Sequence, residues 1–304
     1  MTDQDCILLL QWALPRLRLQ WTGFRKVRRQ VCKRISWRMR ELDLPDAAAY
    51  CSYLKQRPDE WQVLDSLCRV TISRFFRDKR VFQFLEQQVL PYLAYPLLAG
   101  GEHELRCWSI GCASGEEPYT LAILWETVFR TRFPGIMIMI VATDADETMM
   151  ERSRGGCYTS GSLKELPVEW VARAFKASGR NYCISDDFKE RVTFLRQDIR
   201  KSTPEGRFHL VLCRNSVFTY FDEGLQEKML EQIAAKLLPG GALVIGIHES
   251  LPRGQGREQF EVWSDRLKVF RKGTSEMRDP RMDLPAASCG NLQSPRFKIN
   301  CKLR

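Results

Sequence analysis

The stretch "WSIGCASGEEPYTLAILW" (residues 108–125) joins an apolar segment to a turn with two glycines and then to two adjacent glutamates. An apolar run that ends in such a turn and continues as a helix is typical of the first strand and helix of a parallel sheet. Glu116 and Glu117 would stand at the start of that helix. A carboxylate at this position either caps the helix, which stabilises it by about 0.3–1 kcal/mol, or binds a ligand.

The same alternation of apolar runs and helical stretches continues to about residue 250. The predicted strands are continuously apolar rather than alternating, and they read "LRCWSIGC", "GIMIMIVATD", "RVTFLRQD", "FHLVLCRN" and "GALVIGIH". Strands of this kind belong to a parallel sheet that is covered by helices on both faces. We therefore predict a doubly wound, mostly parallel α/β fold, with "FEVWSDRLKVFRK" (residues 260–272) as an antiparallel pair at its edge.

Three further regions are predicted around this sheet. Residues 1–80 have helical spacing and form a small all-helical domain, while residues 81–272 form the α/β domain. Residues 155–194 are too long for an ordinary connection, which indicates an inserted subdomain with a small hairpin. The tail at 273–304 has no apolar period, and we predict that it is disordered.

The charge is concentrated at the two ends of the chain. The 304 residues carry a net charge of +10, and residues 1–80 hold 17 Lys and Arg against nine Asp and Glu. In "FRKVRRQVCKRISWRMREL", apolar residues recur at steps of three or four and the basic residues lie largely off that stripe. This pattern predicts an amphipathic helix with a basic outer face.

Composition gives expectations about compartment and metals. The most apolar N-terminal run, "ILLLQWAL", is interrupted by Pro15 and is far shorter than the roughly 20 residues of a membrane span, so we expect no membrane insertion. Acidic Asp3 and Asp5 stand where a signal peptide would be positive, which favours the cytoplasm. Eleven scattered cysteines without a CxxC pair indicate reduced, mostly buried thiols, and with three histidines we expect no metal.

Acidic residues follow several of the predicted strands. Ligands of open α/β sheets bind outside the carboxyl ends of the strands, where Glu116 or Glu117, Asp144 and Asp198 stand. An acid at the end of the second strand is the position that binds ribose hydroxyls. The turn "GCASGEE" has only two glycines, and its negative charge would repel a pyrophosphate. These features argue against NAD and ATP and favour S-adenosylmethionine, which has an adenosine, an ammonium group and a sulfonium but no phosphate.

Several segments resemble the CheR-type chemotaxis receptor methyltransferases, in order from about residue 15 to 272. They are "TISRFFRD", "WSIGCASGEEPYTLAI", "VATDADETMMERSRGGCY", "FHLVLCRNSVFTYFDEGLQEKML" and "LPGGALVIGIHES". The resemblance implies a class I, Rossmann-like methyltransferase that uses S-adenosylmethionine, yields S-adenosylhomocysteine, and esterifies glutamate side chains of receptor helices.

The resemblance also implies roles for individual residues. Arg77 and Tyr220 correspond to residues beside the reacting centre. The positions implied to bind the cofactor are Thr71, Ser73, Arg77, Glu117, Asp144, Asp198, Ile199, Arg214 and Asn215. Three of them depart from the family pattern, because Thr71 and Asp198 stand where the family often has Asn and Ser73 stands where it usually has Thr.

The implied substrate gives the basic helix a partner. Substrate helices that bear several glutamates are acidic, and a basic surface would attract them. We expect Arg28, Arg29, Lys33 and Arg38 to contribute to this surface, and we expect a monomer. A solvated helix face without a partner is the alternative.

Two other functional classes stay open. A pI of 9.1 suits a nucleic-acid methyltransferase, but "CRNSVFTYF" lacks the "NPPY"-like segment of base-amino enzymes and the aromatic residues do not interleave with the basic run. The second class is a regulatory module that binds the cofactor without transferring its methyl group.

Overall fold

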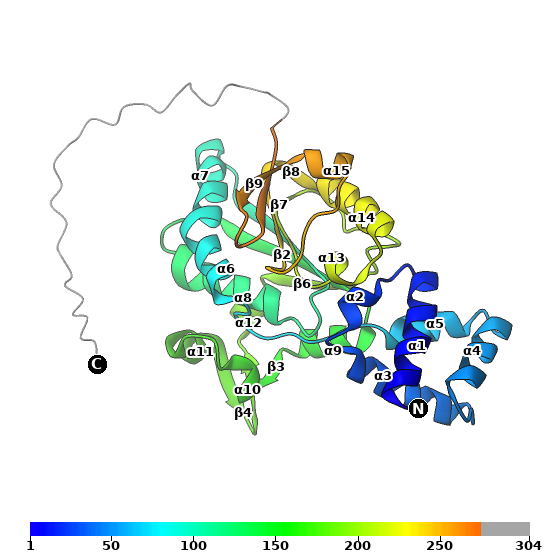
Figure 1. The fold of residues 1–304 in the computed structure, drawn as a ribbon. Coiled ribbons are helices and arrows are strands. Elements are labelled where there is room, and N and C mark those ends of the chain that lie inside the picture. Colours follow the sequence, from blue (N-terminus) through cyan, green and yellow to red (C-terminus); the bar gives the residue numbers. More distant parts are fainter. Residues whose placement is uncertain (275–304) are drawn as a thin grey trace, which may run out of the picture. The chain divides into compact units, whose positions relative to one another are not determined.

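The computed structural model describes residues 1–274, of which Met1–Gly273 form one compact unit. A seven-stranded sheet lies at the centre of this unit, in the order β6-β2-β1-β7-β8-β10-β9 (Figure 1). Its strands are β1 (Glu104–Ile110), β2 (Met137–Asp144), β6 (Val192–Arg196), β7 (Phe208–Cys213), β8 (Leu237–Ile245), β9 (Phe260–Ser264) and β10 (Val269–Lys272).

The strand pairing confirms the predicted fold class. β1 pairs in parallel with β2 and β7, β2 pairs in parallel with β6, and β7 pairs in parallel with β8. β10 runs antiparallel to both β8 and β9, which is the predicted antiparallel pair at the edge. The carboxyl ends of β6, β2, β1, β7 and β8 therefore lie along the same edge of the sheet.

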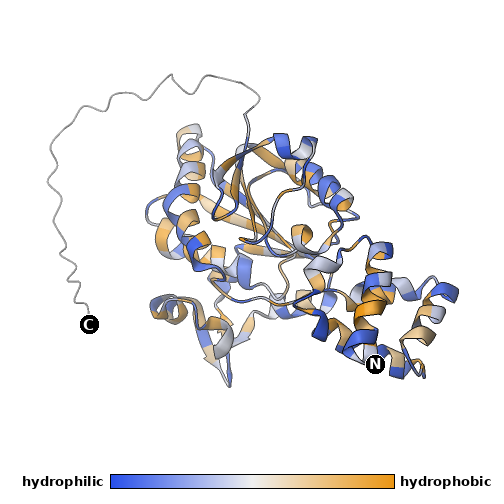
Figure 2. Cartoon of the chain, viewed as in Figure 1, coloured by the Kyte–Doolittle hydropathy of each residue, from blue (hydrophilic) through white to orange (hydrophobic). Residues whose placement is uncertain are grey.

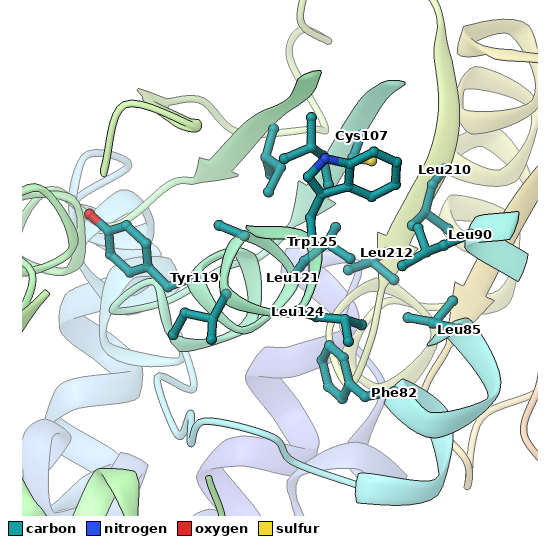
Figure 3. Packing of buried hydrophobic residues seen from close by; sticks show 14 of the residues in the cluster. Phe82, Leu85, Leu90, Cys107, Tyr119, Leu121, Leu124, Trp125, Leu210 and Leu212 are labelled. Atoms are coloured by element: carbon teal, nitrogen blue, oxygen red, sulfur yellow. The ribbon is translucent and has the colours of Figure 1, made fainter. Parts of the chain in front are cut away.

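Helices cover both faces of the sheet. Successive side chains of β1 point to opposite faces of the sheet and belong to two separate cores. Cys107 packs with α8 and the segment from α6 to α7, whereas Trp108 packs with α14. Figure 3 shows the first core, in which Trp125 and Leu124 lie close to Leu212. The helical segments are α6 (Lys79–Phe84), η2 (Leu85–Val89), α7 (Leu90–Gly100), α8 (Glu116–Leu124), η3 (Trp125–Phe129), α9 (Glu147–Gly155), α13 (Val217–Tyr220), α14 (Glu223–Lys236) and α15 (Gln255–Glu258).

The hydropathy of the chain follows this layering. In Figure 2 the strands of the sheet are coloured mostly hydrophobic, while α14 carries many hydrophilic residues on its outer side. α14 is amphipathic, because Met229, Leu230 and Ile233 are buried and the intervening charged residues are exposed.

The segment between β2 and β6 forms the expected inserted subdomain. It contains a separate three-stranded antiparallel sheet in the order β3-β5-β4, in which β4 and β5 are a hairpin and β3 adds a third strand. Gly179 has φ +59° in the hairpin turn, a conformation that glycine adopts without a steric penalty. The elements are β3 (Cys157–Thr159), α10 (Ser160–Leu163), α11 (Val168–Ala174), β4 (Phe175–Ser178), β5 (Asn181–Ile184) and α12 (Asp186–Lys189).

The N-terminal region is helical, as predicted. Val31, Ile35 and Met39 of the basic helix are buried in a core formed by the helices of this region. Asp46 caps the next helix by accepting a hydrogen bond from the backbone N–H of Ala49 at 2.8 Å. The helices are α1 (Asp3–Ala13), η1 (Leu14–Leu17), α2 (Trp21–Phe24), α3 (Arg28–Glu41), α4 (Ala47–Gln56) and α5 (Glu60–Leu67).

The prediction that the cysteines are reduced is wrong for four of them. Disulfides join Cys6 to Cys32, with Cα atoms 5.8 Å apart, and Cys157 to Cys183, with Cα atoms 4.0 Å apart. The first pair forms because α1 packs on α3, and the second because the β3–β5 register places the two residues opposite each other. Among the described free cysteines, Cys51 is half-buried and the others, Cys68, Cys107, Cys112 and Cys213, are buried.

The domain boundaries at residues 80 and 272 stay predictions. Between α5 and α6, residues 68–78 contain no α-helix or strand. Of the tail predicted to be disordered, residues 275–304 lie outside the described residues. Within residues 1–274, no helix is both long and apolar enough to cross a membrane.

Candidate active site

The turn after β1 is attached to the end of β2. The backbone N–H groups of Gly111 and Cys112 both donate to the carbonyl of Thr143, at 2.8 and 3.1 Å. Gly111 has φ +68°, and a Cβ at this position would collide with the side chain of Ser216. This position therefore requires glycine, and its small size brings the turn against the segment that follows β7.

Two adjoining cavities open at this edge of the sheet, and together we call them the cleft. The first holds about 790 Å³ of empty space, open solvent included. The cavities share Val70, Gly111 and Asn215 as lining residues. Among the predicted site residues, Asp144, Asp198, Ile199 and Tyr220 line the first cavity, and Ser73, Arg77, Glu117 and Arg214 line the second.

Asp144 lies at the end of β2 and is held by backbone donors. Its Oδ2 accepts from Ala113 N at 2.9 Å, and its Oδ1 accepts from Asp146 N at 2.9 Å. Burial raises the pKa of this carboxyl above its usual value, although both hydrogen bonds act in the opposite direction. Each carboxylate oxygen has a second lone pair, so Asp144 can still accept hydrogen bonds from a diol.

The two glutamates at the start of α8 have different environments. Glu116 is buried, and both its carboxylate oxygens accept from Ser114 Oγ, at 3.0 and 2.8 Å. Glu117 lines the second cavity, where Oε1 accepts from Ser109 Oγ at 2.9 Å and Oε2 accepts from Arg214 Nη1 at 3.0 Å. Of the two, Glu117 is the residue that can contact a ligand, whereas the Glu116 carboxylate is hydrogen-bonded within the turn.

Arg214 joins the ends of three segments. Besides binding Glu117, its Nη2 donates to Asp78 Oδ2 at 2.7 Å and to the carbonyl of Arg77 at 2.9 Å. Its side chain is only 2% exposed, and its Nε has no hydrogen-bond partner within residues 1–274. A buried donor without a partner beside a cavity fits a site that receives an acceptor from a ligand.

The segment before α6 contributes unequally to the cleft. Ser73 and Arg77 line the second cavity, and Arg77 Nη1 donates to the carbonyl of Ile72 at 3.3 Å. Thr71 is not among the lining residues of either cavity within residues 1–274, and its hydroxyl contacts Arg34 Nη2 at 3.5 Å. The role predicted for Thr71 therefore has less geometric support than the roles predicted for Ser73 and Arg77.

Tyr220 lies at the boundary between the cleft and the helical region. Its ring packs on Phe24 with ring centroids 5.1 Å apart, and its carbonyl accepts from Gln20 N at 2.9 Å. Burial raises the pKa of Tyr220 to about 12, against an opposing effect of the positive charge of Arg77. The phenol therefore stays protonated at neutral pH.

Asn215 is positioned by a residue that the sequence did not reveal. Glu249 is buried, and it accepts from Asn215 N at 3.0 Å, Gly246 N at 2.5 Å and the hydroxyl of Thr219 at 2.5 Å. Asn215 has φ +54°, a conformation that costs a non-glycine residue free energy unless the surroundings hold it. Burial raises the pKa of Glu249 above its usual value, although the three hydrogen bonds act to lower it.

Asp198 is paired more fully than expected. Arg200 donates to both of its oxygens, with Nε to Oδ1 at 2.9 Å and Nη2 to Oδ2 at 2.6 Å. The guanidinium of Arg200 also binds Asp65 of α5. Ile199, the other residue predicted on this side, is nearly buried in the first cavity.

The four basic residues predicted to bind substrate do not share one environment. Arg29 and Lys33 are exposed, and Lys33 Nζ lies 5.3 Å from the ring centroid of Trp37. Arg28 pairs with Asp3 at 2.9 Å. Arg38 binds the buried Glu60 through Nε at 3.0 Å and Nη2 at 2.8 Å, so its guanidinium stabilises the helical core.

Sequence reasoning missed the partners that hold the site residues. They are Asp65, Asp78, Arg200 and Glu249, of which Asp78 belongs to the motif "TISRFFRD" and Glu249 to the motif "LPGGALVIGIHES". For the pairing of Asp65 with Arg200 no local signal existed, since the two residues are 135 positions apart.

The fold and the cleft define a class. A mostly parallel sheet of seven strands, with the last strand pair antiparallel and a ligand cleft at the strand carboxyl ends, is the class I S-adenosylmethionine-dependent methyltransferase fold. Residues 71–268 match the family described as CheR methyltransferase, SAM binding domain, and residues 26–65 match the CheR methyltransferase all-alpha domain. The chain therefore belongs to the CheR methyltransferase family, which confirms the predicted family and cofactor.

Individual relatives agree with this family. A chemotaxis protein methyltransferase of Listeria innocua is 35% identical over 186 residues, which cover 61% of this chain and 68% of the relative. Chemotaxis protein methyltransferase 1 of Pseudomonas aeruginosa is 34% identical over 182 residues, 58% of this chain and 65% of the relative. An uncharacterized 104.1 kDa protein of Rhodobacter capsulatus is 30% identical over 257 residues, which cover 84% of this chain but 26% of the relative. The chain thus spans about a quarter of that longer protein.

Proposed function

We propose that this chain transfers a methyl group from S-adenosylmethionine to glutamate side chains of a chemotaxis receptor or a related signalling protein, as a cytoplasmic monomer. Family membership and the names of two relatives, both chemotaxis protein methyltransferases, support the reaction class. The nature of the acceptor rests on the chemistry of the cleft and on the charge of the helical region.

The residues of the cleft suit the cofactor. The second cavity contains both an acid, Glu117, and the arginines Arg77 and Arg214, which suits the ammonium and carboxylate of an amino-acid group. Asp144 is placed to accept from ribose hydroxyls, with Ile199 as an apolar surface in the same cavity. When bound, S-adenosylmethionine supplies a methyl group on a sulfonium, which a carboxylate oxygen can accept as an ester.

The observation that carries the acceptor assignment is the lack of a free base in the cleft. Within residues 1–274, the cavity lining contains no histidine and no lysine, and its carboxylates accept hydrogen bonds from protein donors. The lining thiols, Cys68 and Cys112, have pKa values raised by burial. An acceptor that is already ionised at neutral pH needs no base, and a glutamate with a pKa near 4.3 meets this condition.

Tyr220 and Arg77 then serve to position the acceptor carboxylate, and neither has to remove a proton from it. The protonated phenol can donate a hydrogen bond to the acceptor carboxylate, and the charge of Arg77 favours an anion nearby. Both residues line the cleft, so they can orient an acceptor that enters beside Asn215.

The position of the basic helix supports an acidic partner. Phe24 packs on Tyr220, and Arg29 follows five residues later, which places it within about 18 Å of the Phe24 backbone. Arg25, Lys26, Arg29, Lys33 and Arg40 are exposed. A positive surface close to the catalytic tyrosine would attract a helix that bears several glutamates.

The test is transfer of a labelled methyl group from S-adenosylmethionine to acceptors of different chemistry. A glutamate-rich receptor helix fragment is expected to be labelled, and the same fragment with its glutamates replaced by glutamine is the matched control. Label in single-stranded DNA or RNA instead would show a nucleic-acid methyltransferase. Binding of the cofactor without label in any acceptor would indicate a regulatory module.

A further inference from the structure

Arg200 lies between two carboxylates that belong to different parts of the chain. Its Nη1 and Nη2 donate to Asp65 Oδ1 and Oδ2, both at 2.7 Å, and its Nε and Nη2 bind Asp198. Asp65 is on α5 of the helical region, and Asp198 follows β6 of the sheet. One guanidinium thus forms paired contacts with a carboxylate on each side, a geometry that lysine cannot reproduce.

This ion bridge is well shielded from water. The side chains of Arg200, Asp65 and Asp198 are 23%, 16% and 14% exposed. The guanidinium also lies 5.7 Å from the ring centroid of Phe221. Ion pairs on open surfaces contribute little, but a shielded pair costs more when one partner is removed, because the other charge stays behind.

A second contact crosses the same boundary close by. Arg69, just after α5, donates from Nη1 to the carbonyl of Ala145 at 2.7 Å. Ala145 directly follows Asp144, the residue assigned to the ribose. The end of α5 and the residues after it therefore attach to the sheet beside both acids of the first cavity.

The helical region supplies part of the wall of that cavity. Asp65, Cys68, Arg69 and Val70 line it opposite residues from the strand ends. Because Arg200 occupies both oxygens of Asp198, that carboxylate is held in one orientation. Burial alone would raise the pKa of Asp198, but the hydrogen bonds and charge of Arg200 outweigh it and lower the pKa below its usual value, so the bridge is ionised at neutral pH.

We infer that Arg200 is a positioning residue. By joining Asp65 to Asp198, it holds the helical region against the half of the cleft that contains Asp144. Cofactor affinity therefore depends on Asp65, which lies outside the sheet domain. The inference rests on the proposed binding of the cofactor in this cleft. Asp65 and Arg200 both line this cavity, and we assign them to the shape of its wall, not to the reaction with the substrate.

The experiment measures binding of S-adenosylhomocysteine to the full chain by calorimetry. Asp65→Asn and Arg200→Gln are each expected to raise the Kd about tenfold or more, because the cavity wall loses the contact that holds it; tenfold corresponds to about 1.4 kcal/mol. Arg200→Lys keeps the charge but not the paired geometry, and an intermediate loss is expected. The matched control is Asp59→Asn, since Asp59 is exposed at the start of α5 and its side chain caps nothing.

The double variant Asp65→Asn with Arg200→Gln separates positioning from a general loss of structure. If the two residues act as one bridge, the double variant raises the Kd by much less than the product of the two single effects. Independent, multiplicative effects would overturn the inference, as would single variants whose Kd stays within twofold of the unchanged protein.

A measurement on the unchanged protein keeps the test valid if the variants unfold. Addition of S-adenosylhomocysteine is expected to slow amide hydrogen exchange in residues 65–70, because the ligand would stabilise the closed wall. No change in exchange there, with clear protection around Asp144, would contradict the inference. Failure of the unchanged protein to bind the ligand at all would instead refute the proposed function.

Discussion

The buried Arg214 and the half-buried Glu117 form an ion pair across the carboxyl ends of β1 and β7, with Oε2 and Nη1 3.0 Å apart. The pair explains why two glutamates follow each other at the start of α8. Glu116 is used within its own turn by Ser114, whereas Glu117 is anchored by Arg214 and faces the second cavity. The two residues are adjacent in sequence and serve different purposes.

Glu117→Gln is therefore expected to weaken binding of S-adenosylhomocysteine about tenfold or more, because a charged hydrogen bond contributes about 1.5–3 kcal/mol. Glu116→Gln is the matched control, and its Kd is expected to stay close to that of the unchanged protein. Calorimetry on both variants measures the difference. A larger loss for Glu116→Gln would reverse the assignment of the two glutamates.

Asp144→Ala is expected to weaken the same binding by about 10–100-fold, the effect of losing charged hydrogen bonds to a diol. The change also removes the acceptor for Ala113 N and Asp146 N, so the turn after β1 loses a contact. Glu151→Ala, at an exposed position of α9, is the control and should bind normally. Unaltered binding by Asp144→Ala would show that the ribose is held elsewhere.

Tyr220→Phe is expected to leave cofactor binding unchanged and to slow methyl transfer about tenfold, since one hydrogen bond of about 1.4 kcal/mol is lost. The pKa of Tyr220 is about 12, so the phenol stays protonated and the transfer rate should be flat from about pH 6 to 10. Below this range the rate should fall as the acceptor glutamate is protonated. A transfer rate that rises steeply near pH 8 in the unchanged protein would reveal a base. Equal losses of cofactor binding and methyl transfer in Tyr220→Phe would contradict the role assigned to Tyr220.

Because of His209, the free energy of unfolding is expected to depend on pH, independently of the activity. Its Nδ1 accepts from Arg106 N at 3.0 Å, and burial lowers its pKa below the usual 6.5. Below pH 6.5 the unfolded chain therefore binds more protons, and the stabilisation present above this pH is lost as the pH falls. Urea unfolding should show a decrease of at most about 1.4 kcal/mol per pH unit from this residue, and His209→Asn should reduce the slope. An identical slope in both proteins would contradict this origin.

Local sequence patterns were sufficient for the sheet and for its ligand edge. Continuous apolar runs indicated the parallel strands, and the polar residues directly after them, such as Asp144 and Asn215, line the cleft. These features depend on neighbouring residues along the chain, so a period or a strand end reveals them.

Long-range partners could not be predicted in the same way. The ion pairs of Glu117 with Arg214 and of Asp65 with Arg200 join residues about 100 or more positions apart, and nothing local in the sequence pairs them. The Cys157–Cys183 disulfide was likewise missed, because it depends on the β3–β5 register. The ion pair of Arg38 with the buried Glu60 could not be predicted either, and a role of Arg38 in binding substrate stays a prediction.

The most direct measurement of the central claim is the chemical stability of the transferred methyl group. A glutamate-rich receptor fragment labelled by this protein with S-adenosylmethionine is treated with mild base, and volatile methanol is collected. A glutamate methyl ester is expected to release nearly all of its label as methanol. Label that stays on the acceptor after base treatment would indicate N-methylation and would contradict the proposed transfer to a carboxylate.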